Sequence, residues 1–238
     1  KEVLQTQKHD EMLLRQEIAA LKTSAFTLSI GATLTAGEHL LAHPLALWCK
    51  DRPQVKASVS IADTAKLLSL LDKGEIDCAL VEGIFDSNKY AWQRWSRERM
   101  VCVKGPTNLS AQNTSPKRKT LSFREILKET LIIREEGSGS RAVLEAALAR
   151  HNLAPKSFER VVEAKSLRVA LEMTAVGLGI TFAYEPAVKE DLAQGKLIEL
   201  PLDEEGLDHD ICFVWQRTSA FAKRYLQLFH ELRSYCRE

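Results

Sequence analysis

An alternation of strand-like and helix-like segments constrains the fold of this chain more than any other feature of its sequence. The stretches FTLSIGA (26–32) and KASVSIA (56–62) have the composition of strands, and IDCALVEG (76–83) is an apolar run that ends at acidic Glu82 and a glycine. Helix-like segments at 35–51 and 65–74 lie between them. Strands that alternate with helices of this length predict right-handed crossover connections and a parallel sheet.

The ends of these helices carry their own signals. Thr35 and Glu38 have the spacing of a capping box, in which each side chain bonds the backbone amide of the other's residue. Asp63 and Thr64 are expected to cap the second helix, and Gly74 is expected to end it.

The second half of the chain repeats this plan. In order, it reads as a strand and loop (131–140), a helix (141–151), a strand (158–164), a helix (166–177) and a strand (178–185). Residues 70–83 and 173–186 match, because each has a helix end, a glycine and an apolar strand that finishes at a glutamate. The sequence therefore predicts two copies of one α/β unit.

A last strand (211–216) and an amphipathic helix (219–236) follow the second copy, so they are expected to return to the first unit. The two crossings between units predict hinge strands near 99–104 and 209–216. The predicted organisation is therefore a helical segment at 1–24, a first subdomain at 25–104 and 208–238, and a second subdomain at 105–207.

Composition excludes several classes of function. The chain of 238 residues has 33 Lys and Arg against 32 Asp and Glu, a net charge of +1, which argues against a general nucleic-acid surface. The basic run PKRKT (116–120) lies among Ser, Asn and Pro and is interpreted as a solvated loop. No window approaches the roughly 20 apolar residues of a membrane span, and residues 1–25 have no signal-peptide pattern.

Cysteine usage points to a reducing compartment. The five cysteines are widely spaced and form no CxxC or Cys/His metal pattern, so reduced thiols in a cytoplasmic protein are expected, with a redox switch left open. His39 and His43 have i, i+4 spacing, but no third ligand lies nearby in the sequence, so no metal site is predicted. Catalytic motifs are absent as well, and we expect neither an enzyme nor a cofactor.

The loops GATLTAG (31–37) and GSGSRA (137–142) occupy matching places, each between a strand and a helix. The first amides of a helix lack internal partners and carry partial positive charge. If the two units face each other, both loops meet at one cleft suited to a small anion or polar metabolite. Each loop taken singly is explained equally well as an ordinary helix cap. Glu135 and Glu136 are expected to be solvated or paired with Arg134 or Arg141.

In their order and spacing, these elements resemble the effector-binding domain of LysR-type transcriptional regulators. The likeness is carried by GATLTAGEHLLAHPLALWCKDRPQV, IADTAKLLSLLDKGEIDCALVEG, LIIREEGSGSRAVLEAAL and VALEMTAVGLGITFAYEPAV, and it covers residues 26 to about 235. The resemblance implies two Rossmann-like subdomains joined by two crossing strands, as in type 2 periplasmic binding proteins, with a small-molecule or inorganic anion effector in the cleft. It also implies a homodimer or homotetramer.

The same resemblance implies that residues 1–22 end a linker helix, and that promoter DNA is bound only through a winged helix-turn-helix domain outside this sequence. Family members that sense peroxide use a cysteine pair in the second subdomain, where this chain has no cysteine between 103 and 211. The surroundings of EEGSGSR are most similar to regulators of inorganic sulfur or carbon assimilation.

By resemblance, the effector is held by hydroxyl side chains of the two matching loops, with further candidates at the ends of neighbouring strands and helices. The residues are Thr33, Thr35, Ser138 and Ser140, followed by Asp63, Glu82, Arg141, Ser166 and Thr181. Two other readings stay open: a two-lobed solute-binding protein for a small anion or metabolite, and an enzyme domain such as a transferase or dehydratase.

Overall fold

The computed structural model describes residues 7–8, 10–12, 26–106, 120–203 and 207–236. The chain forms two compact units, residues 1–96 with 210–238 (unit 1) and residues 97–209 (unit 2). Two strands contribute to both units: β4 (Tyr90–Lys104) and β9 (Asp208–Gln216). Over the described part of the chain, no helix is long and apolar enough to cross a membrane.

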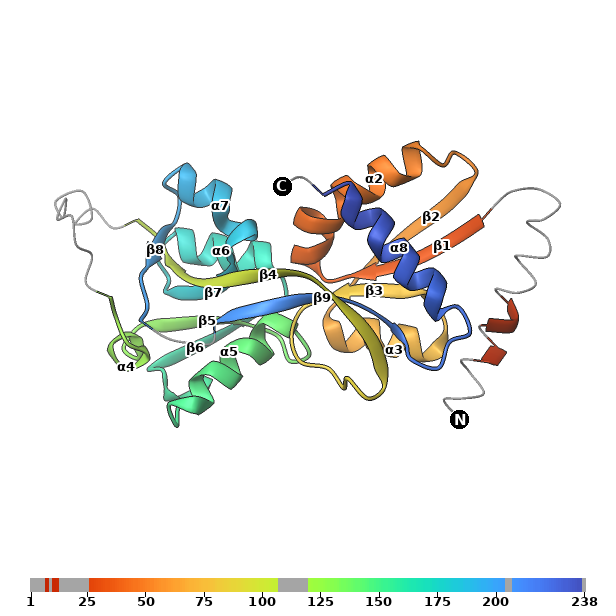
Figure 1. Ribbon diagram of the computed structural model, residues 1–238. Coiled ribbons are helices and arrows are strands. Elements are labelled where there is room, and N and C mark those ends of the chain that lie inside the picture. The colour runs from red at the N-terminus through yellow and green to blue at the C-terminus, as the bar shows by residue number, and fades with distance from the viewer. Residues whose placement is uncertain (1–6, 9, 13–25, 107–119, 204–206, 237–238) are drawn as a thin grey trace. The chain divides into compact units, whose positions relative to one another are not determined.

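Unit 1 is a mixed sheet with helices on both faces (Figure 1). Besides β4 and β9, its elements are β1 (Phe26–Ala32), η1 (Ala36–Leu41), α2 (Ala42–Lys50), β2 (Val55–Ile61), α3 (Thr64–Lys73), β3 (Cys78–Val81) and α8 (Ala222–Ser234). The strand order is β2-β1-β3-β9. As predicted, β1 pairs in parallel with both β2 and β3, whereas β9 runs antiparallel to β3. Helices α2 and α8 pack side by side on one face, and α3 covers the other.

The two helix starts of unit 1 differ from each other. Asp63 has an extended backbone and accepts a hydrogen bond from the Lys66 amide at 2.7 Å, and Gly74 ends α3 with φ of 67°, so the predictions for Asp63 and Gly74 are confirmed. Thr64 does not cap α3: it is the first residue of the helix, and its hydroxyl donates to the Glu82 carbonyl. The capping box predicted at Thr35 is wrong. Thr35 already has helical backbone angles (φ −60°, ψ −48°) and makes no side-chain cap bond, because the helix begins one residue earlier, at Leu34, and continues into the wide π-helical turn η1.

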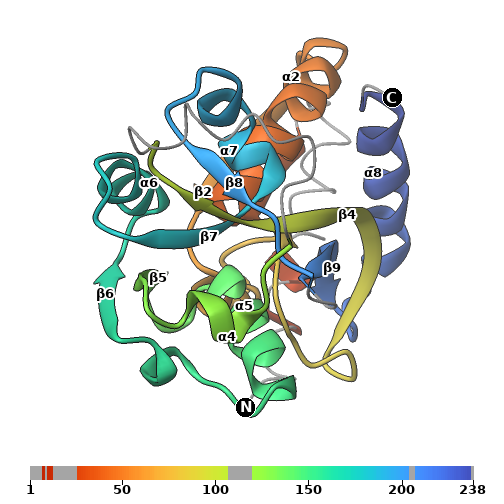
Figure 2. The same ribbon diagram turned by 90° about the vertical axis from the view of Figure 1, so that its left-hand side faces the viewer.

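Unit 2 has the same kind of architecture. Its elements are α4 (Phe123–Ile126), β5 (Thr130–Arg134), α5 (Gly139–Arg150), η3 (Pro155–Ser157), β6 (Arg160–Ala164), α6 (Leu167–Ala175), β7 (Ile180–Tyr184), α7 (Glu185–Ala193) and β8 (Ile198–Leu200). The strand order is β4-β7-β5-β6, with β8 beside β4. Strand β5 is parallel to β6 and β7. Figure 2 shows α6 and α7 on one side of these strands and α4 and α5 on the other.

Burial in unit 2 follows from this layering. Leu131, Ile132 and Ile133 of β5 are each at most 3% exposed, and all five residues of β7 are buried. A strand covered by helices on both faces reads as a continuous apolar run rather than an alternating one. The core thereby fixes the ends of β5 and β7, and so the place where helix α5 begins.

Strand β4 is longer than the sequence predicted. The predicted hinge strand begins near residue 99, but β4 begins at Tyr90. In its first half only Tyr90 and Trp95 are buried, and the residues around them, among them Arg94 and Arg97, are exposed or partly exposed, so no regular alternation marks the strand in the sequence. The units change over between residues 96 and 97 and between 209 and 210, and the subdomain boundaries drawn from the sequence remain a prediction.

Two predictions fall mainly outside the described residues. Within 1–24, only residues 7–8 and 10–12 are described, and they are helical. Of the basic run 116–120, only Thr120 is described.

Candidate functional site

In unit 1, the candidate hydroxyls lie where β1 ends and η1 begins. Thr33 is 2% exposed and Thr35 is 3% exposed. The backbone of Thr33 is tied down, because its amide donates to the Leu80 carbonyl at 3.0 Å and its carbonyl accepts from the Gly37 amide at 2.7 Å. Its Oγ1 atom is buried without a hydrogen-bond partner among the described residues. A buried hydroxyl left in this way is costly, so Thr33 has a donor to offer a ligand.

The start of α3 lies against the end of β3. The hydroxyl of Thr64, which is 4% exposed, donates to the carbonyl of Glu82 at 2.6 Å. The Glu82 side chain is also buried, at 4% exposure. The Asp63 carboxylate already serves the first turn of α3. Asp63 therefore has a structural role that the sequence reading did not separate from ligand binding.

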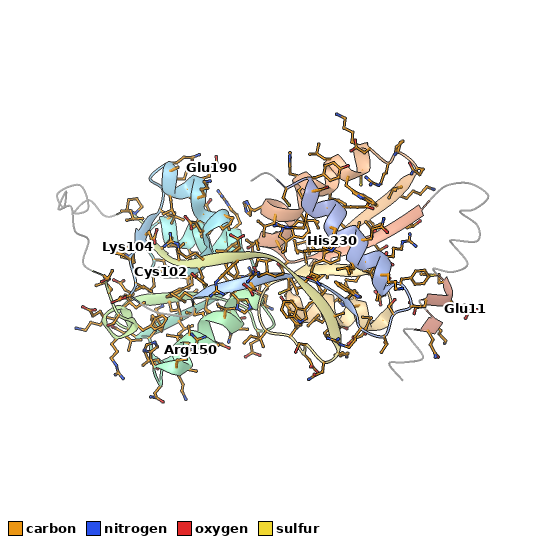
Figure 3. The ribbon with its side chains drawn as sticks, in the orientation of Figure 1. Glu11, Cys102, Lys104, Arg150, Glu190 and His230 are labelled. Carbon is orange, nitrogen blue, oxygen red and sulfur yellow. The ribbon has the colours of Figure 1, made fainter. Side chains whose placement is uncertain are left out.

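In unit 2, Ser138 and Ser140 form the best-defined polar pair. Their Oγ atoms are 3.0 Å apart, and the two residues are 3% and 8% exposed. Ser138 occupies the N-cap position of α5 with extended backbone angles, yet its side chain makes no cap hydrogen bond. The hydroxyl thus points to its serine neighbour instead of to the helix amides. Arg150, labelled in Figure 3, marks the opposite end of the same helix.

The backbone at this turn explains the glycines of the GSGS sequence. Gly137 has φ of 91°, a left-handed conformation that a side chain disfavours. Gly139 is buried in the first turn of α5. Because Gly139 has no side chain, the backbone amides at the start of α5 are not covered on the side from which a ligand would approach.

Arg141 follows the serine pair but is fully engaged by carboxylates. It pairs with Glu145 at 2.8 Å, with Glu163 at 2.9 Å and with Glu136 at 3.7 Å, and it donates to the Arg134 carbonyl. Desolvation alone would lower the pKa of Arg141, but the hydrogen bonds that it donates to Glu145 and Glu163 raise it. Arg141 is therefore a cation that the chain has already neutralised.

The two glutamates before the serine loop, Glu135 and Glu136, are paired with Arg134 and Arg141, as the sequence predicted. Arg134 donates to both carboxylate oxygens of Glu135 at 2.8 Å. Partial burial would raise the pKa of Glu135, but hydrogen bonds from Arg134 and from its own backbone hold it below the usual value. Because Glu135 is paired with Arg134, it does not place an unpaired negative charge beside the serines.

The last two candidates serve the fold of unit 2. The Ser166 hydroxyl accepts from the Val169 amide at 3.5 Å, a long bond at the start of α6. Thr181, 2% exposed, donates to the Ile132 carbonyl at 2.7 Å and so joins β7 to β5. Their hydrogen-bonding capacity goes to neighbouring backbone.

Redox and metal chemistry find little support in the described residues. All five cysteines are free thiols, and Cys102, on β4 in Figure 3, is 1% exposed. Burial raises the pKa of Cys102 far above that of an ordinary thiol. Across the described ranges, no group of three His, Cys, Asp or Glu side chains is placed to hold a metal ion.

Comparison with known proteins decides the family. A sequence model described as "LysR substrate binding domain" matches residues 23–237. The chain belongs to this family. It is a LysR-type effector-binding domain, as the order of its elements implied.

The relatives of this LysR domain include both regulators and a transport component. It is 31% identical over 206 residues to the phosphonates import ATP-binding protein PhnC of Anaeromyxobacter dehalogenans, covering 85% of this chain and 40% of that protein. It is 25% identical to the HTH-type transcriptional regulator CysL of Bacillus subtilis, covering 79% of this chain and 60% of that protein. The chain thus spans about half the length of the curated relatives that it matches.

Solved structures show the same fold. The regulatory domain of CcmR from Synechocystis in complex with 2-PG aligns with a TM-score of 0.74 at 17% identity, over 88% of this chain and 96% of that one. The reduced form of OxyR aligns with a TM-score of 0.70 at 23% identity, over 89% and 96%. The fold is that of LysR regulatory domains, which confirms the predicted fold class.

Proposed function

We propose that this LysR domain is the sensing part of a cytoplasmic transcriptional regulator and that it binds a small anion or polar metabolite. The role in transcription is proposed from the similarity to transcriptional regulators such as CysL and the CbbR regulator of Rhodospirillum rubrum. Promoter DNA is expected to be bound by a winged helix-turn-helix domain outside this sequence. We expect the protein to act as a homodimer or homotetramer.

One observation carries the ligand proposal: Ser138 and Ser140 are buried together at the start of a long helix, and Ser138 does not cap that helix. A helix start presents backbone N–H groups with partial positive charge, and two adjacent hydroxyls add donors. Since Arg141 is already neutralised by three glutamates, the anion would be held mainly by neutral donors. Such a site suits a small, fully ionised oxyanion or carboxylate.

The nine candidates divide by how their polar atoms are used. Thr33, Thr35, Ser138 and Ser140 make no side-chain cap to their helices, and we propose that they contact the effector directly. Asp63, Ser166 and Thr181 bond the backbone, and Arg141 bonds glutamates, so we propose that they position the loops. Glu82 is proposed to position the start of α3 through its carbonyl.

Named ligands of related structures are consistent with an anion. The effector domain of QuiR was solved with shikimate, and a mutant OxyR2 regulatory domain from Vibrio vulnificus was solved with sulfate. Both ligands are anions, but these proteins share only 15% and 21% identity with this chain. The chemical class therefore rests on the serine site, and the identity of the effector is for experiment to decide.

The proposed mechanism is a shift of populations. An effector that draws on hydroxyls of both units would favour those arrangements of the units that it binds best, and it can shift the equilibrium only by that difference in affinity. In an oligomer, the change would alter the spacing of the DNA-binding domains. A solute-binding protein shares this fold, but the HTH-type regulators among the relatives favour a regulator.

A thermal-shift screen with sulfate, sulfite, thiosulfate, phosphate, carboxylates and sugar phosphates tests the proposal. A ligand at 100 times its dissociation constant adds about 2.7 kcal/mol of stability. Ser138→Ala should weaken the binding of the best ligand by about 1.5–3 kcal/mol, the typical value for a hydrogen bond to a charged group. Ser157→Ala is the matched control, since this hydroxyl of unit 2 accepts from the Ala154 amide and lies outside the site. Equal affinities of wild type and Ser138→Ala would contradict the site.

A further inference from the structure

Helix α3 carries a carboxylate that bonds both of the strands that contribute to the two units. Oδ1 of Asp72 accepts from the Tyr90 hydroxyl at 2.8 Å and from the Gln216 side-chain amide at 2.7 Å. Oδ2 of Asp72 accepts from the Lys89 ammonium at 2.8 Å. Tyr90 is the first residue of β4, and Gln216 is the last residue of β9. One side chain therefore ties α3 to the ends of β4 and β9 that lie in unit 1.

The surroundings of this carboxylate strengthen its bonds. The side chains of Asp72 and Lys89 are only 24% and 28% exposed, so water screens their ion pair less than it would at an open surface. Burial and the hydrogen bond to Asp72 raise the pKa of Tyr90 above its usual value, so its hydroxyl stays protonated and donates at neutral pH. Hydrogen bonds to an ionised group are shorter and stronger than those between neutral groups. The three donors thus hold the carboxylate in one position.

The residue that follows β9 joins the two strand ends to each other. The Arg217 guanidinium donates to the carbonyls of Ser87 and Asn88 at 2.6 and 3.0 Å. It also donates to the Tyr90 carbonyl at 3.1 Å, and the Arg217 amide donates to the Lys89 carbonyl at 3.3 Å. The start of β4 and the end of β9 therefore form one block, and this block is bonded to the carboxylate of α3.

The opposite end of α3 lies where strand β3 ends. There the Thr64 hydroxyl donates to the Glu82 carbonyl at 2.6 Å. The 10 residues of α3 span about 15 Å, at a rise of about 1.5 Å per residue. Between the two ends, Leu67 and Leu71 pack in an apolar cluster with residues of β3 and β9 and with Tyr90. Helix α3 thus connects the end of β3 with the block formed by the start of β4 and the end of β9.

Apolar packing is non-directional, so it does not by itself fix the position of α3 along the strands. The bonds of Asp72 are directional and reach both strands at once. We infer that Asp72 is a positioning residue, which makes the unit 1 ends of β4 and β9 follow α3 when the start of this helix is displaced. Because the Thr33 amide bonds the Leu80 carbonyl near the end of β3, an effector held at Thr33 would act on this end of α3. This last step rests on the proposed function.

The test displaces the start of α3 by mutation of the whole chain and needs no effector. Thr64→Val nearly keeps the shape of the side chain but leaves the Glu82 carbonyl without its hydroxyl donor. The indole N–H resonances of Trp92 and Trp215, each assigned by its loss in the Trp→Phe variant, report on the start of β4 and the end of β9. Thr64→Val should move both resonances. In the Asp72→Asn background, the same change should move them at most about half as far, the sign of an interaction between the two positions.

Two further variants make the comparison specific. Asp86→Asn is the matched control, since this carboxylate accepts from the Asn88 amide in the loop before β4 and does not bond α3. In its background, Thr64→Val should move both resonances as far as in the wild-type chain. Tyr90→Phe deletes one hydroxyl of the cluster and should reduce the response like Asp72→Asn, which guards against a folding defect of the latter. A purely structural Asp72 would lower the urea midpoint and leave the transmitted shift unchanged.

Equal movement of the two resonances in the wild-type and Asp72→Asn backgrounds overturns the inference, because α3 would then act on the strands through apolar packing alone. So does a Thr64→Val variant whose Trp92 and Trp215 resonances stay at their wild-type positions. Neither outcome involves the serine pair of α5 or any ligand, so a failure of this inference is distinct from a failure of the proposed effector site.

Discussion

Asp63 and Ser138 both stand at helix starts, but only Asp63 makes a side-chain cap bond, and the consequence of this difference can be measured. Asp63 accepts a hydrogen bond from the Lys66 amide at 2.7 Å, whereas the Ser138 side chain makes no cap bond. Replacing an N-cap residue by alanine costs about 0.5–2 kcal/mol. Loss of a carboxylate from the positive end of a helix costs a further 0.3–1 kcal/mol or so. We therefore expect Asp63→Ala to destabilise the protein by about 1.5 kcal/mol.

That loss corresponds to a fall in Tm of about 3–6 °C, because chains of 150–250 residues lose about 2–4 °C per kcal/mol. Urea denaturation followed by circular dichroism gives the free energy, and hydrogen exchange of α3 amides shows whether the effect is local. Asp63→Asn is the matched control, since asparagine caps about as well as aspartate and only the charge is lost. It should cost no more than about 1 kcal/mol.

The result that would refute this reasoning is a variant with unchanged stability and lost effector binding. If Asp63→Ala unfolds like wild type yet no longer responds to the effector, then Asp63 is a ligand-binding residue and its cap bond to Lys66 is energetically unimportant. If Ser138→Ala loses about as much stability as Asp63→Ala, then Ser138 is a structural cap, and the site proposed at α5 loses its main support.

Two further predictions concern packing and thiol chemistry. A Cβ at Gly179 would lie 2.1 Å from the Thr130 carbonyl oxygen, so Gly179→Ala should cost about 3 kcal/mol in urea denaturation. Gly177 has φ of 86°, but a Cβ there would meet open space, so Gly177→Ala should cost only about 1–2 kcal/mol. If the two variants lost the same free energy of unfolding, the predicted clash at Gly179 would be contradicted. Burial, with the charge of Asp210, raises the pKa of Cys212 to about 12, so its thiol stays protonated at pH 8. Peptide mass spectrometry should show iodoacetamide labelling of Cys212 only after unfolding by guanidinium, and rapid labelling of the native chain would refute this.

Much of the fold follows from short-range patterns. The order of strands and helices, the parallel pairing of β1 with β2, and the α3 cap at Asp63 were all readable from apolar periodicity and from residues a few positions apart. Local physics is enough here, because a helix cap or an apolar run depends on neighbours along the chain. The same reasoning failed at Thr35, since the wide turn η1 is not encoded in a capping pattern.

The use of each polar group was decided by tertiary structure. Trp48 and Glu231 are 183 positions apart, and nothing in either segment predicts their hydrogen bond. Arg141 was a candidate anion ligand by sequence, yet Glu163 from the next strand neutralises it. A side chain's hydrogen-bonding capacity is limited, and whether the chain or a ligand takes it depends on which distant segments the fold brings near. The sequence therefore named the residues of the helix starts, and only the packed structure showed which of their side chains are bonded to other parts of the chain.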